Sequence, residues 1–291
     1  YWRDWSSDVC SSDLIAPAFA VRLTELTEGN PRFLDGALRH LVESGKLVRK
    51  AGRWLTEGLE LEPADLPGDY RDLVQQRLRK TGPDALLLLR LVALHGRRLP
   101  LPRATGLVGW SEEQVLDAAQ ALAREGFLRV TEGGLEVSGG HVAAAAEVDW
   151  AAAERARWCG RVADAIRDAA RAAGHERSRE VLFDLARLGL VSDDPARGVE
   201  PGLLAARMSF SLGAPAQAHK LGEQVAPHLR EAVDRLAWLH VMGDSLRSQA
   251  QMDQAEAMYE QALILADDLG DRVQAATILT SHAILHQIRS R

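Results

Sequence analysis

Two histidines near the end of the chain have the spacing of metal ligands. His282 and His286 are four residues apart in a segment whose pattern predicts a helix, so both imidazoles can lie on one face and share a metal ion. A zinc site needs at least a third ligand, and none is evident from the sequence. No glutamate follows the first histidine in the manner of a metalloprotease. The sequence therefore favours an ordinary helix surface here and predicts no metal site.

The other reactive side chains form no catalytic pattern. Cys159 follows Trp158 in a predicted helix, where a buried and unreactive thiol is expected. No Gly-x-Ser-x-Gly nucleophile motif occurs. The Gly-x-x-x-x-Gly-Lys-Ser/Thr phosphate loop is missing too, since Gly45 and Lys46 are followed by leucine and lack the earlier glycine. The sequence predicts no enzyme, no catalytic residue and no cofactor in this chain, which by itself should neither bind nor hydrolyse ATP.

Composition favours a soluble helical protein. The 291 residues have a net charge of -6, so no global basic surface attracts nucleic acid or anionic membranes. Aromatic residues make up only 5%, which favours helix over sheet. No apolar run approaches the roughly 20 residues of a membrane span, and two cysteines make no disulfide framework. We expect a mostly α protein of the cytoplasm, with no membrane partner.

Residues 1–14 follow neither helical nor strand periodicity. Translated backwards, Asp4 to Leu14 give a DNA string that resembles a common sequencing-library adapter read in frame. A disordered N-terminal tail is the alternative. We expect residues 1–14 to be a non-native, adapter-derived tail, and the natural protein to begin upstream of Ile15, so that the chain is a fragment.

A glycine-proline junction separates two predicted helices in the next segment. Apolar positions from Ala16 to Thr27 have helical spacing. Gly29 then suits a helix C′ position, Asn30 suits an N-cap, and Pro31 suits the first residue of a helix that extends to about residue 44. Gly45 is expected to end that helix. Residues 47–48 and 54–55 predict a small hairpin, and residues 66–67 begin another helix.

Residues 83–138 predict three helices and two short strands. Ser111 and Gln114 have the spacing of a capping box, which begins the third helix, and that helix extends to about Arg124. Strands are expected at residues 127–130 and 135–137. Three helices followed by a small β-wing are typical of a winged helix.

Charge argues against DNA binding by this module. Between Thr81 and Gly140 there are six arginines and no lysine against seven acids. Contact with phosphates needs a basic footprint, so direct binding of nucleic acid is not expected. A role in packing within the protein is favoured instead.

The last ninety residues have the pattern of tetratricopeptide (TPR) repeats. Gly243, Ala255, Tyr259 and Ala262 occupy the usual glycine, alanine, aromatic and alanine positions of helix packing. Upstream, Gly213 and Ala218 correspond to Ala250 and Ala255 at an offset of 37 residues. An irregular helical bundle is the alternative. Before the repeats, helices are expected over residues 148–173 and 177–188, with a linker over residues 191–201.

Taken together, these features resemble the STAND class of AAA-related signalling ATPases, especially LuxR/MalT-like regulators and ATPase modules fused to Ser/Thr kinases. The resemblance extends over Ile15 to Arg291. The matching residues are Leu26, Thr27, Glu28, Gly29, Asn30, Pro31, Phe33, Leu34, Leu66, Pro67, Arg71, Leu73, Val74, Arg77 and Leu78, followed by the wing.

The resemblance implies a nucleotide-binding domain upstream, with ATP and Mg²⁺ as cofactors of the intact parent. In that class a Gly-x-Pro element of the helical lid approaches the adenine, and this role falls on Gly29 and Pro31. After the wing, relatives often read Arg/Phe-x-His-Asp-x-Val-Arg, and only His141 is present from that pattern. The resemblance therefore assigns no role to the start of the helix that follows the wing.

We expect a mostly α fold with lid helices and a winged helix, followed by a TPR-like α-solenoid. The expected segments are an adapter-derived tail (1–14), the helical lid of a truncated ATPase domain (15–80), a winged-helix module (81–147), a helical linker (148–200) and truncated TPR-like repeats (201–291).

The expected function is regulatory and non-catalytic. The repeats would bind a protein, a peptide or a small inducer. The winged helix would transmit the binding of that ligand to a nucleotide switch. A stand-alone TPR scaffold and a DNA-binding winged-helix regulator are the alternatives.

Overall fold

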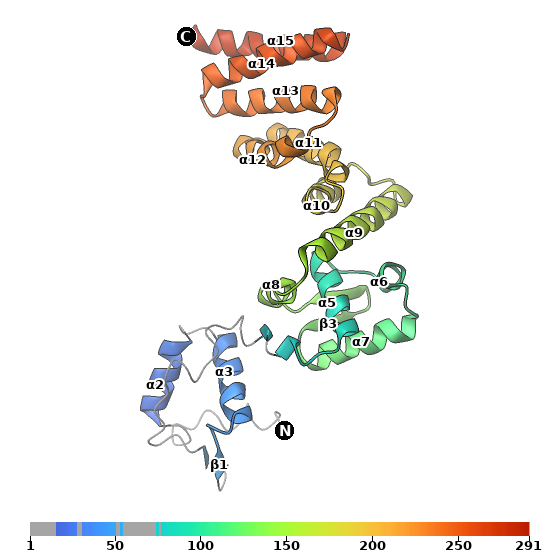
Figure 1. The fold of residues 1–291 in the computed structure, drawn as a ribbon. Coiled ribbons are helices and arrows are strands. Elements are labelled where there is room, and N and C mark those ends of the chain that lie inside the picture. Colours follow the sequence, from blue (N-terminus) through green and yellow to red (C-terminus); the bar gives the residue numbers. More distant parts are fainter. Residues whose placement is uncertain (1–15, 28–30, 51–52, 55–73, 76, 291) are drawn as a thin grey trace. The chain divides into compact units, whose positions relative to one another are not determined.

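The structure is a computed structural model that describes residues 16–27, 31–50, 53–54, 74–75 and 77–290, and these are mostly helical (Figure 1). The chain divides into two compact units. The first contains residues 1–93, 97–101 and 111–149, and the second contains residues 94–96, 102–110 and 150–291.

The first unit begins with a helix pair around a small apolar core. Helix α3 starts at Pro31 and is followed by Gly45 with a φ of 73°, as predicted for a first-turn proline and a terminating glycine. The elements are α2 (Pro17–Leu26), α3 (Pro31–Glu43), β1 (Arg49–Lys50) and β2 (Arg53–Trp54). The core contains Phe19, Leu23, Phe33, Ala37, Leu38, Leu41 and Leu47.

The strands of the hairpin after α3 lie closer to the turn than predicted. Its register pairs Arg49 with Trp54, so residues 47 and 48 lie outside the strands. Leu47 is instead buried, and its amide donates to the carbonyl of Leu41, which is left unpaired by the end of α3. The predicted helix from residue 66 lies largely outside the described residues, as do Gly29 and Asn30.

Three helices and a hairpin then follow in the predicted order. Ser111 accepts a hydrogen bond from the amide of Gln114, and the Gln114 side chain accepts one from the amide of Ser111. The predicted capping box is therefore confirmed. The elements are α5 (Pro83–His95), α6 (Leu101–Val108), α7 (Glu112–Arg124), β3 (Leu128–Thr131) and β4 (Gly134–Val137).

A further pairing, which the sequence did not predict, joins Leu99 to the hairpin. Leu99 and Leu135 form an antiparallel bridge and exchange backbone hydrogen bonds of 2.8 and 2.9 Å. A Cβ at Gly134 would collide with the carbonyl of Leu99, and Gly134 has a φ of 133°. Only glycine allows this close approach of the two backbones.

The helix predicted over residues 148–173 is wrong at its start. The structure has α8 (Gly140–Glu147) and α9 (Ala152–Ala172), separated by residues 148–151. Asp149 has a φ of 57°, a conformation that a continuing α-helix excludes. Helix α10 (Arg179–Gly189) follows, with its first turn capped by Ser178.

The linker predicted over residues 191–201 is confirmed for residues 191–195, which lie between α10 and α11, and wrong for residues 196–201, because α11 (Ala196–Ser211) includes Pro201 in its interior. A proline there cannot donate to the carbonyl four residues back, which is that of Arg197. The guanidinium of Arg167 in α9 donates to this carbonyl instead, at 3.0 Å. The predicted boundary between residues 200 and 201 therefore falls inside a helix.

Helices α10 and α11 make a close crossing. A Cβ at Gly189 would lie 2.6 Å from the backbone of Gly198, so the two helices meet backbone to backbone. Neither glycine can be replaced without separating the helices.

The second unit continues as a stack of antiparallel helices in which neighbours along the chain pack together (Figure 1). Alternate helices also contact, since α13 packs against both α11 and α15. The elements are α12 (Pro215–Val225), the 3₁₀ turn η2 (Ala226–His228), α13 (Ala232–Ser248), α14 (Met252–Asp268) and α15 (Arg272–Arg289).

The offset of 37 residues has a structural counterpart. Gly213 ends α11 with a φ of 79°, and Ala250 ends α13 with a φ of 60°, although positive φ is unfavourable for alanine. Ala218 in α12 and Ala255 in α14 are both fully buried. The pairs α11–α12 and α13–α14 are therefore built alike at these positions.

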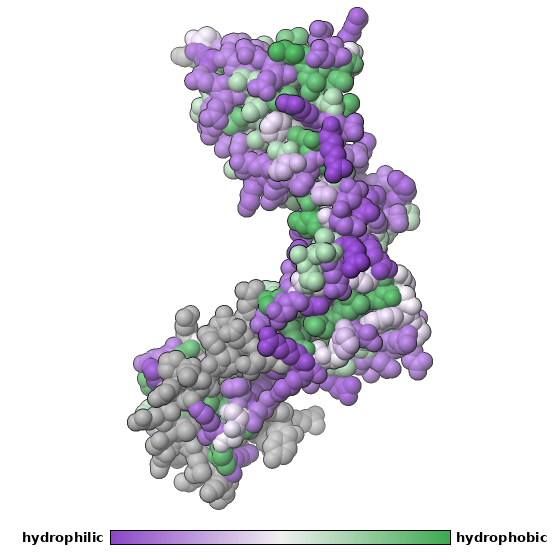
Figure 2. Space-filling model, viewed as in Figure 1, coloured by the Kyte–Doolittle hydropathy of each residue, from purple (hydrophilic) through white to green (hydrophobic). Residues whose placement is uncertain are grey.

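No helix among the described residues is both long enough and apolar enough to span a membrane. On the visible face of α13 to α15, polar and apolar residues are interspersed (Figure 2).

Candidate functional site

The four residues predicted to pack the repeats lie together between α13 and α14. Ala255, Tyr259 and Ala262 are fully buried in one apolar cluster. Gly243 faces the Tyr259 ring, since a Cβ added to it would lie 2.6 Å from ring atom Cε1. The missing side chain of Gly243 is therefore what makes room for the tyrosine.

The Tyr259 hydroxyl is bound into a polar network. It donates to Asp244 Oδ1 at 2.7 Å and accepts from Arg247 Nε at 3.1 Å. Burial and the Asp244 carboxylate raise the pKa of Tyr259, because both disfavour the phenolate. The tyrosine therefore acts as a neutral donor that orients Asp244.

His240 joins this network to the neighbouring helices. Its Nδ1 lies 3.4 Å from Arg207 on α11, and its Nε2 lies 3.3 Å from the Ser281 hydroxyl on α15 and 3.4 Å from Asp244. A guanidinium can only donate, so Nδ1 accepts and Nε2 carries the proton. Burial lowers the pKa of His240; Asp244 opposes this shift, while Arg207 and Arg247 add to it.

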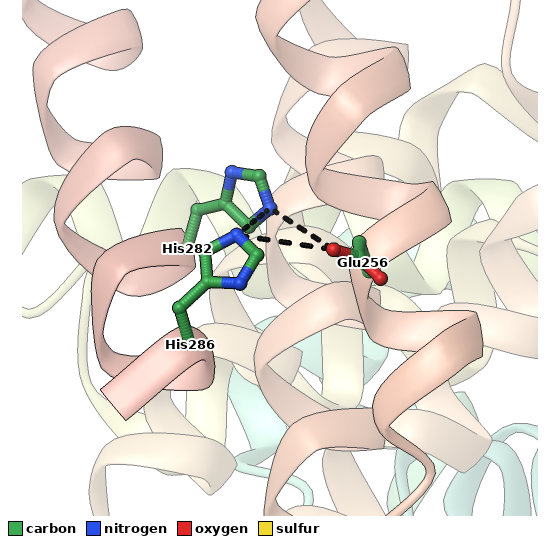
Figure 3. Close-up of side chains that lie close together, drawn as sticks. All are labelled: Glu256, His282 and His286. Atoms are coloured by element: carbon green, nitrogen blue, oxygen red, sulfur yellow. Dashed lines mark hydrogen bonds and ion pairs between the residues drawn. The ribbon is translucent and has the colours of Figure 1, made fainter. Parts of the chain in front are cut away.

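A second cluster lies on the same pair of terminal helices (Figure 3). His282 and His286, one turn apart on α15, have Nε2 atoms 3.1 Å apart. Oε1 of Glu256 on α14 points at them, 3.9 Å from His282 Nε2 and 3.8 Å from His286 Nε2. Three possible metal ligands thus converge from two helices.

The Glu256 carboxylate is held by an arginine on its other side. Arg289 Nη1 donates to Glu256 Oε2 at 2.6 Å, and Arg289 also contacts Asp253. This hydrogen bond from Arg289 holds the pKa of Glu256 below its usual range. One carboxylate oxygen is therefore committed to the arginine, and the other faces the histidines.

Glu256 is a third candidate ligand that the sequence does not indicate, whereas it does indicate the two histidines. The histidine pair is readable because it follows helical periodicity within one segment. Glu256 is 26 residues before His282, and its approach depends on how α14 and α15 pack. The repeat pattern, which predicts that these helices are antiparallel neighbours, was the available signal.

A groove lies between α10 and α12 in the same unit. It has a volume of about 560 Å³. Its lining combines apolar side chains with amides and charges, from Phe183, Asp184, Ala186, Arg187, Leu190, Val191, Gln217, Lys220, Leu221, Gln224 and His228.

The remaining predicted residues do not join these clusters. Pro31 is exposed at the start of α3 in the first unit, and Gly29 lies outside the described residues. Cys159 is fully buried in α9, as expected for a structural thiol.

Comparison with protein-family models, with curated proteins and with solved structures finds no match to this chain.

Proposed function

We propose that this chain is the non-catalytic regulatory part of a STAND-type, ATP-dependent signal transducer or transcriptional regulator. The helical stack is a TPR-like solenoid that binds a protein, a peptide or a small inducer. The segment 81–147 is a winged helix that relays occupancy of the stack to a nucleotide switch. ATP and Mg²⁺ belong to that switch.

The observation that carries the binding role is the groove between α10 and α12. Its volume of about 560 Å³ is in the range of sites that hold small molecules or peptide side chains. Phe183 and Leu221 offer it apolar surface, while Lys220 and Gln224 offer hydrogen-bond donors. This combination suits a ligand with an apolar body and an acidic or amide group.

The stacking of alternate helices supports the solenoid. Helix α13 packs on α11 and on α15, as successive first helices of repeats do. The matching positive φ values at Gly213 and Ala250 place equivalent turns at the same point of two helix pairs. Such repetition is what a repeat array requires.

The charges around the hairpin support packing over DNA binding. Arg98 and Arg129 lie 2.7 and 3.6 Å from the Glu136 carboxylate, which offsets one of their two positive charges within the hairpin region. Helix α7 carries Glu112 and Glu113 in its first turn. An acidic helix start would repel the phosphates of a DNA groove.

Peptides selected by the chain from a phage-displayed random library test the groove. Val191 lines the groove and is 48% exposed, so Val191→Asp places a charge there without disturbing the core. We expect the affinity of selected peptides, measured by fluorescence anisotropy, to fall by about tenfold or more.

The matched control is Val273→Asp, since Val273 is 78% exposed on α15 and lies outside the groove lining. This variant should bind the same peptides as the unchanged chain does. Equal affinities for both variants would contradict the groove as the binding site.

Sequencing the source DNA across the codons for residues 1–14 and upstream tests the connection to an ATPase. The proposal expects the adapter-like codons to be absent and a phosphate-loop motif to be encoded upstream. Genomic codons for residues 1–14 behind a start codon would contradict it, and would favour a stand-alone helical scaffold.

A further inference from the structure

The three converging atoms of Glu256, His282 and His286 have nearly the spacing of ligands around one metal ion. Metal–ligand bonds of about 2.0–2.2 Å place tetrahedral ligands roughly 3.3–3.6 Å apart. The imidazole nitrogens are already 3.1 Å apart, and the carboxylate oxygen is 3.8 and 3.9 Å from them. To share an ion with both imidazoles, the carboxylate oxygen has to approach the two nitrogens by a few tenths of an ångström.

The donor set selects the class of metal. Imidazole nitrogens suit zinc and its neighbours among the transition metals, whereas magnesium and calcium prefer oxygen ligands. Two histidines and one glutamate leave a fourth position for water or for a group of a ligand. The His286 side chain is 55% exposed, so an ion can enter from solvent.

The surrounding side chains hold the ligands in place. Arg289 binds the outer oxygen of Glu256, which leaves the inner oxygen directed at the histidines. The His282 ring packs on the Tyr259 ring, with 5.8 Å between their centroids. Such outer contacts orient metal ligands and raise affinity.

The local charge also suits a cation. Glu256 and Asp253 contribute two negative charges, and Arg289 contributes one positive charge between them. With both histidines neutral, the cluster has a net charge of -1. A divalent ion would therefore be attracted to the site despite the nearby arginine.

We propose that Glu256, His282 and His286 form a binding site for a divalent transition-metal ion of the zinc class. The site joins α14 to α15. Bound metal links two helices that otherwise contact through the apolar cluster and the Arg289 ion pairs, and it stabilises the folded stack by binding only the folded chain.

Titration of the full, tag-free chain with Zn²⁺ by calorimetry, after removal of metals with a chelator, tests the site. We expect one ion per chain and a rise in the thermal unfolding temperature with Zn²⁺ that Mg²⁺ does not cause. Co²⁺ in place of Zn²⁺ should give the visible absorption of a four-coordinate ion.

His286→Ala and Glu256→Gln each remove one ligand. Loss of an outer-shell partner alone typically costs about 10–100-fold in affinity, so each variant should bind Zn²⁺ at least about 100-fold more weakly. The control is His175→Ala, which removes an exposed histidine before α10 and should change nothing. Native-like zinc affinity in both ligand variants, or no zinc binding by the unchanged chain, would overturn the site.

Discussion

At the scale of single residues, Gly243 shows how one absent methyl group permits a helix crossing. The Tyr259 ring fills the space where a Cβ would be, at 2.6 Å. The ring cannot retreat freely, because its hydroxyl is bound by Asp244 and Arg247. Gly243→Ala therefore overpacks the crossing and should lower the free energy of unfolding by about 1–3 kcal/mol, measured by urea-induced unfolding.

The matched control for this substitution is Gly106→Ala. Gly106 lies in α6 with no heavy atom within 4 Å of an added Cβ. Alanine in an open helix position should raise the free energy of unfolding by about 0.5–1 kcal/mol. A stabilising effect of Gly243→Ala as well would show that the Tyr259 ring moves aside without cost.

The candidate metal site was only partly predictable at this scale. His282 and His286 could be paired from the sequence because a helix brings residues four apart onto one face. Glu256 could not be assigned, because its partners lie on a neighbouring helix. The sequence does not specify how the two helices are rotated about their axes, and so which residues face each other. Local periodicity predicts which residues share one face of a helix. Which helix faces contact each other depends on how the helices pack.

At the scale of elements, Pro201 in α11 shows how a distant side chain can permit a proline inside a helix. The carbonyl of Arg197 loses its usual intrahelical donor and gains the Arg167 guanidinium at 3.0 Å. The sequence predicted a linker at this point because the segment contains aspartate, proline and glycine, while the compensating donor lies 30 residues before Arg197 on another helix. By contrast, the Ser111 cap was predictable, since both partners lie within one turn.

A double-mutant cycle on Arg167 and Pro201 tests this substitution of donors. Arg167→Ala alone should cost about 1–3 kcal/mol, because it leaves the Arg197 carbonyl unpaired. Pro201→Ala restores an amide that can donate to the same carbonyl. We therefore expect Arg167→Ala to cost less in the Pro201→Ala background, as measured by urea-induced unfolding. Equal costs in the two backgrounds would contradict the compensating role of Arg167.

At the scale of the whole helical stack, His240 makes stability depend on pH. Its pKa is lowered from 6.5 in the folded chain, chiefly by burial. The unfolded chain therefore takes up a proton near the ordinary histidine value, while the folded chain resists it. The free energy of unfolding should be highest above about pH 7 and should fall as the pH decreases below 6.5.

His240→Gln isolates this contribution, because glutamine keeps a donor toward Asp244 and Ser281 and has no ionisable ring. Denaturant unfolding between about pH 8 and pH 5 should show a shallower pH dependence in this variant than in the unchanged chain. His175→Gln, at an exposed position, should retain the full dependence. An unchanged slope in His240→Gln would exclude His240 as the source.

The mostly helical fold could be predicted from composition and periodicity, and helix ends were predicted where glycine or a capping box marks them. The break at Asp149 and the bridge between Leu99 and Leu135 could not. Both depend on contacts between segments distant in sequence, for which a single chain offers no periodic signal.

The contact of Gly189 with Gly198 gives the α10–α11 pair a mechanical property. At most helix crossings, side chains lie between the two backbones, and changes of their rotamers let one helix shift relative to the other. In α10 and α11 the two backbones touch directly, so changes of rotamer cannot absorb a shift of one helix. The two helices are therefore expected to move together. We expect a ligand that displaces α10 from the groove side to move α11 with it, and α11 in turn packs against α13.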